Sequence, residues 1–195
     1  MQNKKDTKSK IMMAAIQLFP ELGYEKASMR LIAETVGITK PALYYYFKNK
    51  DELFRSIVDY GNQFSIKKLQ EIRDENESIE KKLADLVWIK FSIMHQNEAV
   101  KKFSGWLVTD GMKYLLKIDM EQQIRLQQSI IYDIFEKAIE KGELRKDIDL
   151  ECFTYLLLGA ANVYARRQYI FNENIINNEK IGSLVQTLLR DARTN

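Results

Sequence analysis

Lys40, Tyr44 and Lys50 are the residues whose chemistry and spacing best suit contact with a nucleic acid. Because Lys40 and Tyr44 are four residues apart, a helix would place them on one side. A lysine ammonium reaches a base edge or a phosphate, and a tyrosine hydroxyl donates to a phosphate oxygen. Lys50 stands where a further helix is expected to begin, and the free N–H groups and dipole of a helix start favour a phosphate. The three residues therefore predict a surface that binds a polyanion.

Two short helices joined by a tight turn are expected to position these side chains. Ser28 and Thr39 are good N-caps, and Gly37 suits the turn between the helices. This pattern predicts a helix-turn-helix over about 28–47, whose second helix would lie in a DNA major groove.

The second helix separates a core side from a groove side. Pro41 is tolerated in its first turn, where backbone N–H groups lack helical partners. Leu43 and Phe47 share the face expected to be buried. Two neighbouring faces each carry a pair of residues four positions apart. One pair is Lys40 and Tyr44, and the other is Pro41 and Tyr45.

The rest of the sequence also has a helical period, and the predicted fold class is all-α. Apolar residues over 11–22 recur at spacings of three and four, and Pro20 predicts a kink or an early end of that helix. Asn49 followed by Glu52 predicts a capping box at the start of a long fourth helix. We expect a loop over 73–78 and then helices near 79–95, 98–116, 120–141, 150–171 and 178–191. The helix over 98–116 is expected to be interrupted near Gly105 and Gly111.

The composition excludes several classes of protein. Cys152 is the single cysteine, so it cannot close an internal disulfide, and one cysteine with one histidine cannot make a four-ligand zinc site. The N-terminal residues are charged, whereas a secretory signal peptide would have an apolar region there. The longest nearly apolar stretch, 153–165, falls short of the roughly 20 residues of a membrane span. We expect a cytoplasmic protein with one domain or two small ones, no metal, no cofactor and no membrane partner.

The positive charge is concentrated at one end of the chain. Residues 1–55 contain ten Lys or Arg and six Asp or Glu, a net charge of +4, whereas the other 140 residues carry a net charge of −1. This asymmetry indicates an anionic partner for the first quarter of the chain and another role for the rest.

Two segments resemble the DNA-binding signature of the TetR family of transcriptional regulators. They are residues 14–24 (AAIQLFPELGY) and 32–53 (IAETVGITKPALYYYFKNKDEL), within a match over roughly 5–65. Residues 141–149 (KGELRKDID) are similar to the family's junction before its dimerisation helices. The resemblance implies a DNA-binding domain over 5–65 and an effector-binding and dimerisation domain over 66–195.

The resemblance also assigns roles to single residues. In such a regulator Arg30 would read a base, and the groove side of the third helix would face bases. The implied DNA-contact set is Ser28, Arg30, Thr39, Lys40, Pro41, Ala42, Tyr44, Tyr45 and Lys50. Of these, Thr39, Tyr44 and Lys50 would hold phosphates, whereas Tyr46 is interpreted as a packing residue.

The family resemblance implies a homodimer that binds a palindromic double-stranded operator and releases it when a small molecule binds. Two stripes are interpreted as the dimer seam. The stripes are Phe153, Leu156, Leu157, Ala160, Ala161 and Tyr164, and Ile181, Leu184, Val185, Leu188 and Leu189.

A set of large side chains is interpreted as the lining of a pocket for an effector that is largely apolar or aromatic. These residues are Trp88, Phe91, His95, Trp106, Tyr132, Phe135 and Tyr155. The alternative is that they only fill the core.

The expected function is thus a ligand-responsive repressor. An effector-independent DNA-binding dimer stays open as an alternative, and the choice between repressor and activator depends on where the operator lies. A helical enzyme is a further alternative, but the sequence offers it no nucleophile–base pair and no Gly-rich phosphate loop.

Overall fold

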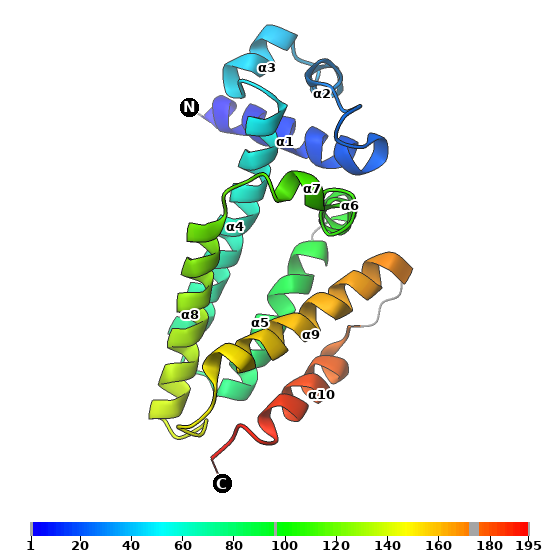
Figure 1. The fold of residues 1–195 in the computed structure, drawn as a ribbon. Coiled ribbons are helices and arrows are strands. Elements are labelled where there is room, and N and C mark those ends of the chain that lie inside the picture. The colour runs from blue at the N-terminus through cyan, green and yellow to red at the C-terminus, as the bar shows by residue number, and fades with distance from the viewer. Residues whose placement is uncertain (1, 96, 172–175, 195) are drawn as a thin grey trace. The chain divides into compact units, whose positions relative to one another are not determined.

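A computed structural model describes residues 2–95, 97–171 and 176–194, with side chains for all of these except 2–5, 90, 92–95 and 169–171. The described residues form ten helices and no strand, which confirms the all-α prediction. The N-terminal helices are α1 (Gln2–Leu22), α2 (Met29–Val36), α3 (Lys40–Tyr46), α4 (Lys50–Asp74) and α5 (Ile79–His95). The others are α6 (Glu98–Leu107), α7 (Met112–Leu115), α8 (Glu121–Glu140), α9 (Leu150–Phe171) and α10 (Asn178–Leu189) (Figure 1).

The helix starts follow the predicted caps. The Ser28 and Thr39 hydroxyls accept hydrogen bonds from backbone N–H groups of α2 and α3, at 3.2 and 3.3 Å. Asn49 accepts from the Glu52 N–H at 2.8 Å, while the Glu52 carboxylate accepts from the N–H of Lys48 in place of that of Asn49. These bonds satisfy helix-start donors that have no helical partner. Local sequence therefore fixes where α2, α3 and α4 begin.

Three helix boundaries differ from the sequence prediction. Helix α1 continues through Pro20 to Leu22, so the predicted early end is wrong. Helix α4 extends to Asp74, so the loop starts later than predicted. The helix expected over 98–116 is interrupted at Gly111 as predicted, where the Gly111 N–H donates to the Trp106 carbonyl at 2.8 Å, but it is not interrupted at Gly105, which lies within α6.

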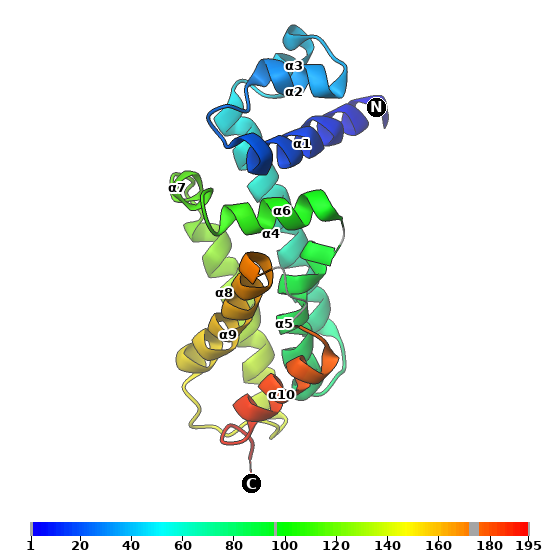
Figure 2. The same ribbon diagram turned by 90° about the vertical axis from the view of Figure 1, so that its right-hand side faces the viewer.

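The chain folds into two compact units. The first contains residues 1–63 and 94–119, and the second contains 64–93 and 120–195. The sequence assigned residues 94–119 to the second domain. They join the N-terminal helices because α6 packs against α1 (Figure 2).

Six aromatic side chains form the core of the first unit, and we call them the aromatic cluster. Phe19 stacks on Trp106 with ring centroids 5.9 Å apart, and both side chains are buried. The other neighbouring rings are stacked, tilted or meet edge to face, and edge-to-face contact is favourable for aromatic pairs. The cluster consists of Phe19, Tyr24, Phe54, Phe103, Trp106 and Tyr114. It joins α1 and α4 to α6 and α7.

The second unit buries one side of α8, α9 and α10. Phe135 of α8 meets Phe153 of α9 edge to face, with centroids 5.2 Å apart. On α9, Leu157 and Ala161 are fully buried, whereas Leu156 and Val163 are 56% and 60% exposed. Half of the α9 stripe interpreted as part of the dimer seam therefore packs inside the chain, whereas Leu156 of that stripe is exposed.

Candidate DNA-binding surface

Helix α3 presents one side of its surface to solvent. Leu43 and Phe47 are buried at 0% and 1% exposure, while Tyr44 and Tyr45 are 41% and 69% exposed. The exposed side also carries Lys40, whose Nζ lies 5.8 Å from the centroid of the Tyr44 ring. This is the division between a core side and a groove side that the spacing predicted.

The other expected contact residues of α3 lie on the same exposed side or at its start. Pro41 and Thr39 are exposed, and Ala42 is half-buried. The Thr39 oxygen caps the helix, but its hydroxyl hydrogen is left to donate to a phosphate. Tyr46 is half-buried and meets Tyr45 edge to face, with ring centroids 5.3 Å apart.

Helix α2 contributes two exposed residues. Ser28 is its cap, and Arg30 is 77% exposed in its side chain. Arg30 Nε lies 3.6 Å from the Glu34 carboxylate, an exposed i,i+4 pair that holds the guanidinium only weakly. A bidentate contact with a guanine edge would be stronger than that pair, so the pair does not prevent Arg30 from reading a base.

Lys50 has a role within the chain that the sequence did not predict. Its Nζ donates to the carbonyl oxygens of Tyr24 at 2.6 Å and Glu25 at 3.2 Å. The same ammonium lies 4.4 Å from the centroid of the Tyr24 ring. An ammonium has three N–H donors, so one is left for a phosphate. Lys50 thus fastens the start of α4 to the turn after α1.

The Tyr24 hydroxyl completes the attachment of this turn to α4. It donates to the carboxylate of Asp51, the residue next to Lys50. Burial first, and then this hydrogen bond, raise the pKa of the Tyr24 hydroxyl above its ordinary value of 10.0. The phenol therefore keeps its proton and remains a donor at neutral pH.

Two further lysines lie near this surface. Lys8 of α1 is exposed, and its Nζ is 5.4 Å from the centroid of the Phe47 ring at the end of α3. Lys48 is exposed in the turn between α3 and α4. The N-terminal excess of positive charge was the sequence feature that could have indicated Lys8 and Lys48. The spacing of residues alone did not show that α1 brings Lys8 beside α3.

Comparison with known proteins identifies the fold and the N-terminal domain. Residues 11–57 match the family described as bacterial regulatory proteins, tetR family. The match covers α2, α3 and the capped start of α4, which are the elements that build the exposed surface. The N-terminal domain is that of the TetR family of transcriptional regulators.

Some relatives of this chain match most of its length, and others match only its N-terminal part. The fatty acid metabolism regulator protein of Bacillus subtilis is 23% identical over 163 residues, which cover 82% of this chain and 81% of that protein. The biofilm regulator IcaR of Staphylococcus epidermidis is 38% identical over 73 residues, covering 37% of this chain and 40% of that protein. The solved structure of the fatty acid degradation regulator FadR from Bacillus halodurans has a TM-score of 0.78 at 20% identity, covering 95% of this chain and 99% of that one. These relatives are named as regulators and give the helical-enzyme alternative no support.

The residues expected to line an effector pocket lie in different parts of the regulator. Trp106 belongs to the aromatic cluster of the first unit, where it is 4% exposed. The others that the structure describes belong to the second unit, where Phe91 and Phe135 are fully buried and Trp88 is 38% exposed. Tyr132 is half-buried. The side chain of His95 lies outside the described residues.

Tyr155 is the most exposed of those members of the set whose side chains the structure describes. Its side chain is 55% exposed on α9. A hydrogen bond with the Glu151 carboxylate raises the pKa of the Tyr155 hydroxyl, and Tyr132 contributes in the same direction. This position suits an interface as well as a pocket, because the ring faces away from the core of its own chain.

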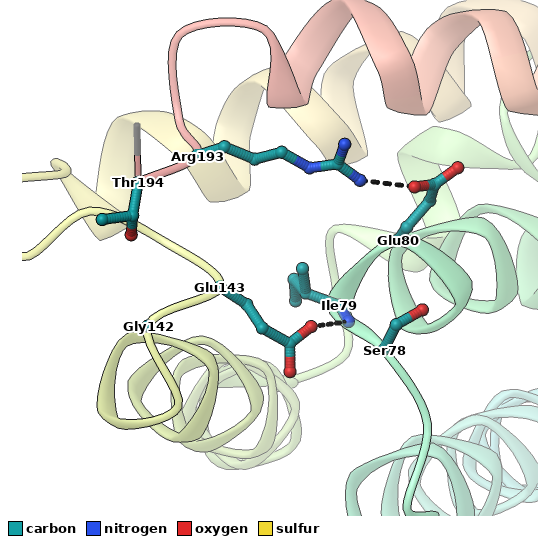
Figure 3. A pocket seen from close by; sticks show the side chains of 7 residues that line it. All are labelled: Ser78, Ile79, Glu80, Gly142, Glu143, Arg193 and Thr194. Atoms are coloured by element: carbon teal, nitrogen blue, oxygen red, sulfur yellow. Dashed lines mark hydrogen bonds and ion pairs between the residues drawn. The ribbon is translucent and has the colours of Figure 1, made fainter.

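A small cavity of about 280 Å³ lies elsewhere in the second unit (Figure 3). The Glu143 carboxylate caps the start of α5 by accepting a hydrogen bond from the Ile79 N–H at 2.6 Å, and Arg193 forms an ion pair with Glu80. None of the residues expected to line an effector pocket contributes to it. The lining residues are Ser78, Ile79, Glu80, Gly142, Glu143, Arg193 and Thr194. Their contacts fasten the C-terminal residues to α5.

The described part of the chain contains no group of three or more His, Cys, Asp or Glu side chains placed to hold a metal ion. Within the same residues, no helix is both long enough and apolar enough to cross a membrane.

We expect the free energy of unfolding to decrease as the pH rises above about 10. Unfolded Tyr24 loses its proton near that pH, whereas folded Tyr24 retains it, so unfolding then releases a proton. The stabilisation is complete below the unfolded pKa and is lost as the pH rises towards the folded pKa. Urea unfolding between about pH 8 and pH 11 measures this slope. Tyr24→Phe should reduce the slope and the exposed control Tyr60→Phe should not; equal slopes for both variants would contradict the assignment.

Proposed function

We propose that this protein is a homodimeric repressor that binds a palindromic operator and releases it when a small molecule occupies the second unit. The observation that carries the proposal is the exposed side of α3, where Lys40, Tyr44 and Tyr45 stand on a helix anchored by Leu43 and Phe47. A recognition helix needs this combination, because its outer side chains must reach base edges while its inner side fixes its position.

The DNA-contact residues proposed are Ser28, Arg30, Thr39, Lys40, Pro41, Ala42, Tyr44, Tyr45 and Lys50. Arg30 and the outer side of α3 would meet bases, while Thr39, Tyr44 and Lys50 would hold phosphates. Lys8 and Lys48 are added to the phosphate contacts because both are exposed beside α3 or just after it.

The experiment that tests DNA reading is selection of bound sequences from a random duplex pool at physiological salt. We expect a palindrome whose half-sites lie about one helical turn apart. Arg30→Ala should cost roughly 1–3 kcal/mol and relax selection at one base position. Arg125→Ala is the matched control, because Arg125 is 75% exposed and pairs with Glu121 four residues away, as Arg30 pairs with Glu34. Enrichment of no sequence, or equal losses in both variants, would contradict the proposal.

The dimer contact proposed uses the exposed apolar face of α9. Tyr155, Leu156 and Val163 are 55%, 56% and 60% exposed, and Gly159 lies between them at helical spacing. An exposed apolar stripe with a small residue at its centre lets a second helix approach closely. A second copy of the chain is the occupant proposed, because a palindromic operator requires two recognition helices related by a two-fold axis.

Val163→Glu should convert the dimer into a monomer, because a carboxylate within an apolar contact would be buried without a partner. Sedimentation velocity at micromolar concentration measures the change. Tyr60→Glu is the control, since Tyr60 is 67% exposed on α4 and has no part in the proposed contact. A Val163→Glu protein that sediments as the parent does would place the dimer contact elsewhere.

Gln168 of α9 supports an effector site in the second unit. Its side chain is 5% exposed, and its Oε1 accepts no hydrogen bond within the described part of the chain. A buried acceptor without a donor costs about 1–3 kcal/mol. Ala161 and Ala165 precede it on the same buried side, where they present only methyl groups. We therefore propose that Gln168 accepts a hydrogen bond from a hydroxyl or N–H group of the effector.

Gln168→Leu should raise the free energy of unfolding of the unliganded protein by about 1 kcal/mol, because it removes the unpaired acceptor. It should also reduce the rise in melting temperature that an effector causes. The relatives named for fatty acid metabolism make a panel of fatty acids the first probes. The exposed control Gln122→Leu should change neither quantity. A less stable Gln168→Leu protein with an unchanged ligand response would refute the role.

A further inference from the structure

Tyr114 of α7 is held against the turn that follows α1. Its ring centroid is 4.2 Å from that of Tyr24, and its hydroxyl donates to Glu25 Oε1 at 3.1 Å. The side chain is 8% exposed, although α7 is a single helical turn. A tyrosine with a buried ring and a satisfied hydroxyl has a fixed position, so α7 is attached to residues 24 and 25 by both apolar and polar contact.

The first turn of α4 also holds the same two residues. Lys50 donates to the carbonyls of Tyr24 and Glu25, and Asp51 accepts from the Tyr24 hydroxyl. The turn after α1 is therefore in contact with both Tyr114 and the start of α4. We call Tyr24, Glu25, Lys50, Asp51 and Tyr114 the tyrosine clamp.

The backbone around Gly111 sets the position of Tyr114. A Cβ atom added to Gly111 would lie 2.9 Å from both the Leu107 Cα and the Trp106 ring. A glycine at this position thus allows the chain to fold back on Trp106 directly before α7. Trp106 in turn stacks on Tyr114, with centroids 6.2 Å apart. The corner between α6 and α7 therefore has little freedom to move without displacing Tyr114.

Two lysines of the same segment favour the clamp electrostatically. Lys113 and Lys117 place their Nζ atoms 5.0 and 5.6 Å from the centroid of the Tyr114 ring. Such cations over an aromatic face stabilise its position by a modest amount at an exposed site.

We propose that Tyr114 is a positioning residue for operator binding, which fixes Lys50 and the first turn of α4 through the turn at Tyr24 and Glu25. This inference rests on the proposed function and deepens it, since it names a residue that acts on DNA without touching it. Lys50 would hold a phosphate only while its ammonium and the helix start are held in place. Loosening Tyr114 should therefore remove phosphate contacts while the recognition helix remains folded.

The position of α7 in the chain makes the clamp suitable for regulation. The chain passes from the first unit to the second after residue 119, and α8 begins at Glu121, six residues after α7 ends. An effector that binds more tightly when the clamp is open would lower operator affinity by opening it.

Three variants separate positioning from general stability. Tyr114→Phe removes the hydroxyl and keeps the ring, Tyr114→Ala removes both, and Met112→Ala is the control from the exposed side of the same turn. Operator affinity is measured by titration over a range of salt concentrations, below the melting temperature of every variant. We expect Tyr114→Ala to lose about tenfold in affinity and Tyr114→Phe about threefold. The slope of log K against log salt should become shallower by about 1 in Tyr114→Ala, because one phosphate contact is lost.

A double-mutant cycle tests the polar part of the clamp. Glu25→Ala should weaken operator binding as much as Tyr114→Phe does, and the double variant should be no weaker than either single variant. Glu25→Gln retains an acceptor oxygen and should restore most of the affinity.

The outcomes distinguish this inference from the proposed function. If Tyr114→Ala has a lower melting temperature but the same slope of log K against log salt as the parent, the positioning role is wrong and Tyr114 has only a structural role. Additive losses in the cycle would overturn the hydroxyl's part. Absence of sequence-selective binding by the parent protein would overturn both the function and the inference, whereas selective binding with unchanged variants would overturn only the inference.

Discussion

The stacking of Phe19 on Trp106 is the interaction on which the first unit depends. Both rings are buried, and they join helices that are about eighty residues apart in sequence. Helix α1 also packs against α2, and α2 packs against α3. The packing of α1 on α6 therefore supports the helices that position the exposed side of α3. A surface that reads DNA must hold its side chains within a fraction of an ångström, and aromatic packing supplies that rigidity where the helices themselves are short.

The elements that depend on near neighbours in sequence were predictable. Ser28, Thr39 and Asn49 mark helix starts because each cap acts on N–H groups two or three residues away. Gly37 ends α2 with a φ of 76°, which a residue with a Cβ rarely adopts. The two sides of α3 follow from a spacing of four. For these features the sequence contained both partners of the deciding interaction within one or two helical turns.

Features that depend on distant partners were not predictable in the same way. Trp106 looked like a pocket residue, because nothing in its own helix shows that Phe19 covers it. Helix α9 has apolar residues on more than one side, so spacing alone could not say that Leu157 would be buried and Leu156 exposed. The two carbonyl partners of Lys50 lie 25 and 26 residues away, and no local pattern indicates them. In each case the tertiary partner decided the role.

The two compact units are not two consecutive pieces of the chain. The backbone passes between them after residues 63, 93 and 119, and α6 and α7 return to complete the core around Phe19 and Phe54. An N-terminal fragment cut at residue 63 would expose those rings to water. To exchange the DNA-binding unit between regulators of this kind, both of its segments would therefore have to be transferred, or the ring contacts rebuilt by matching substitutions. The reason is that the unit is compact in space but is not one continuous segment of the sequence.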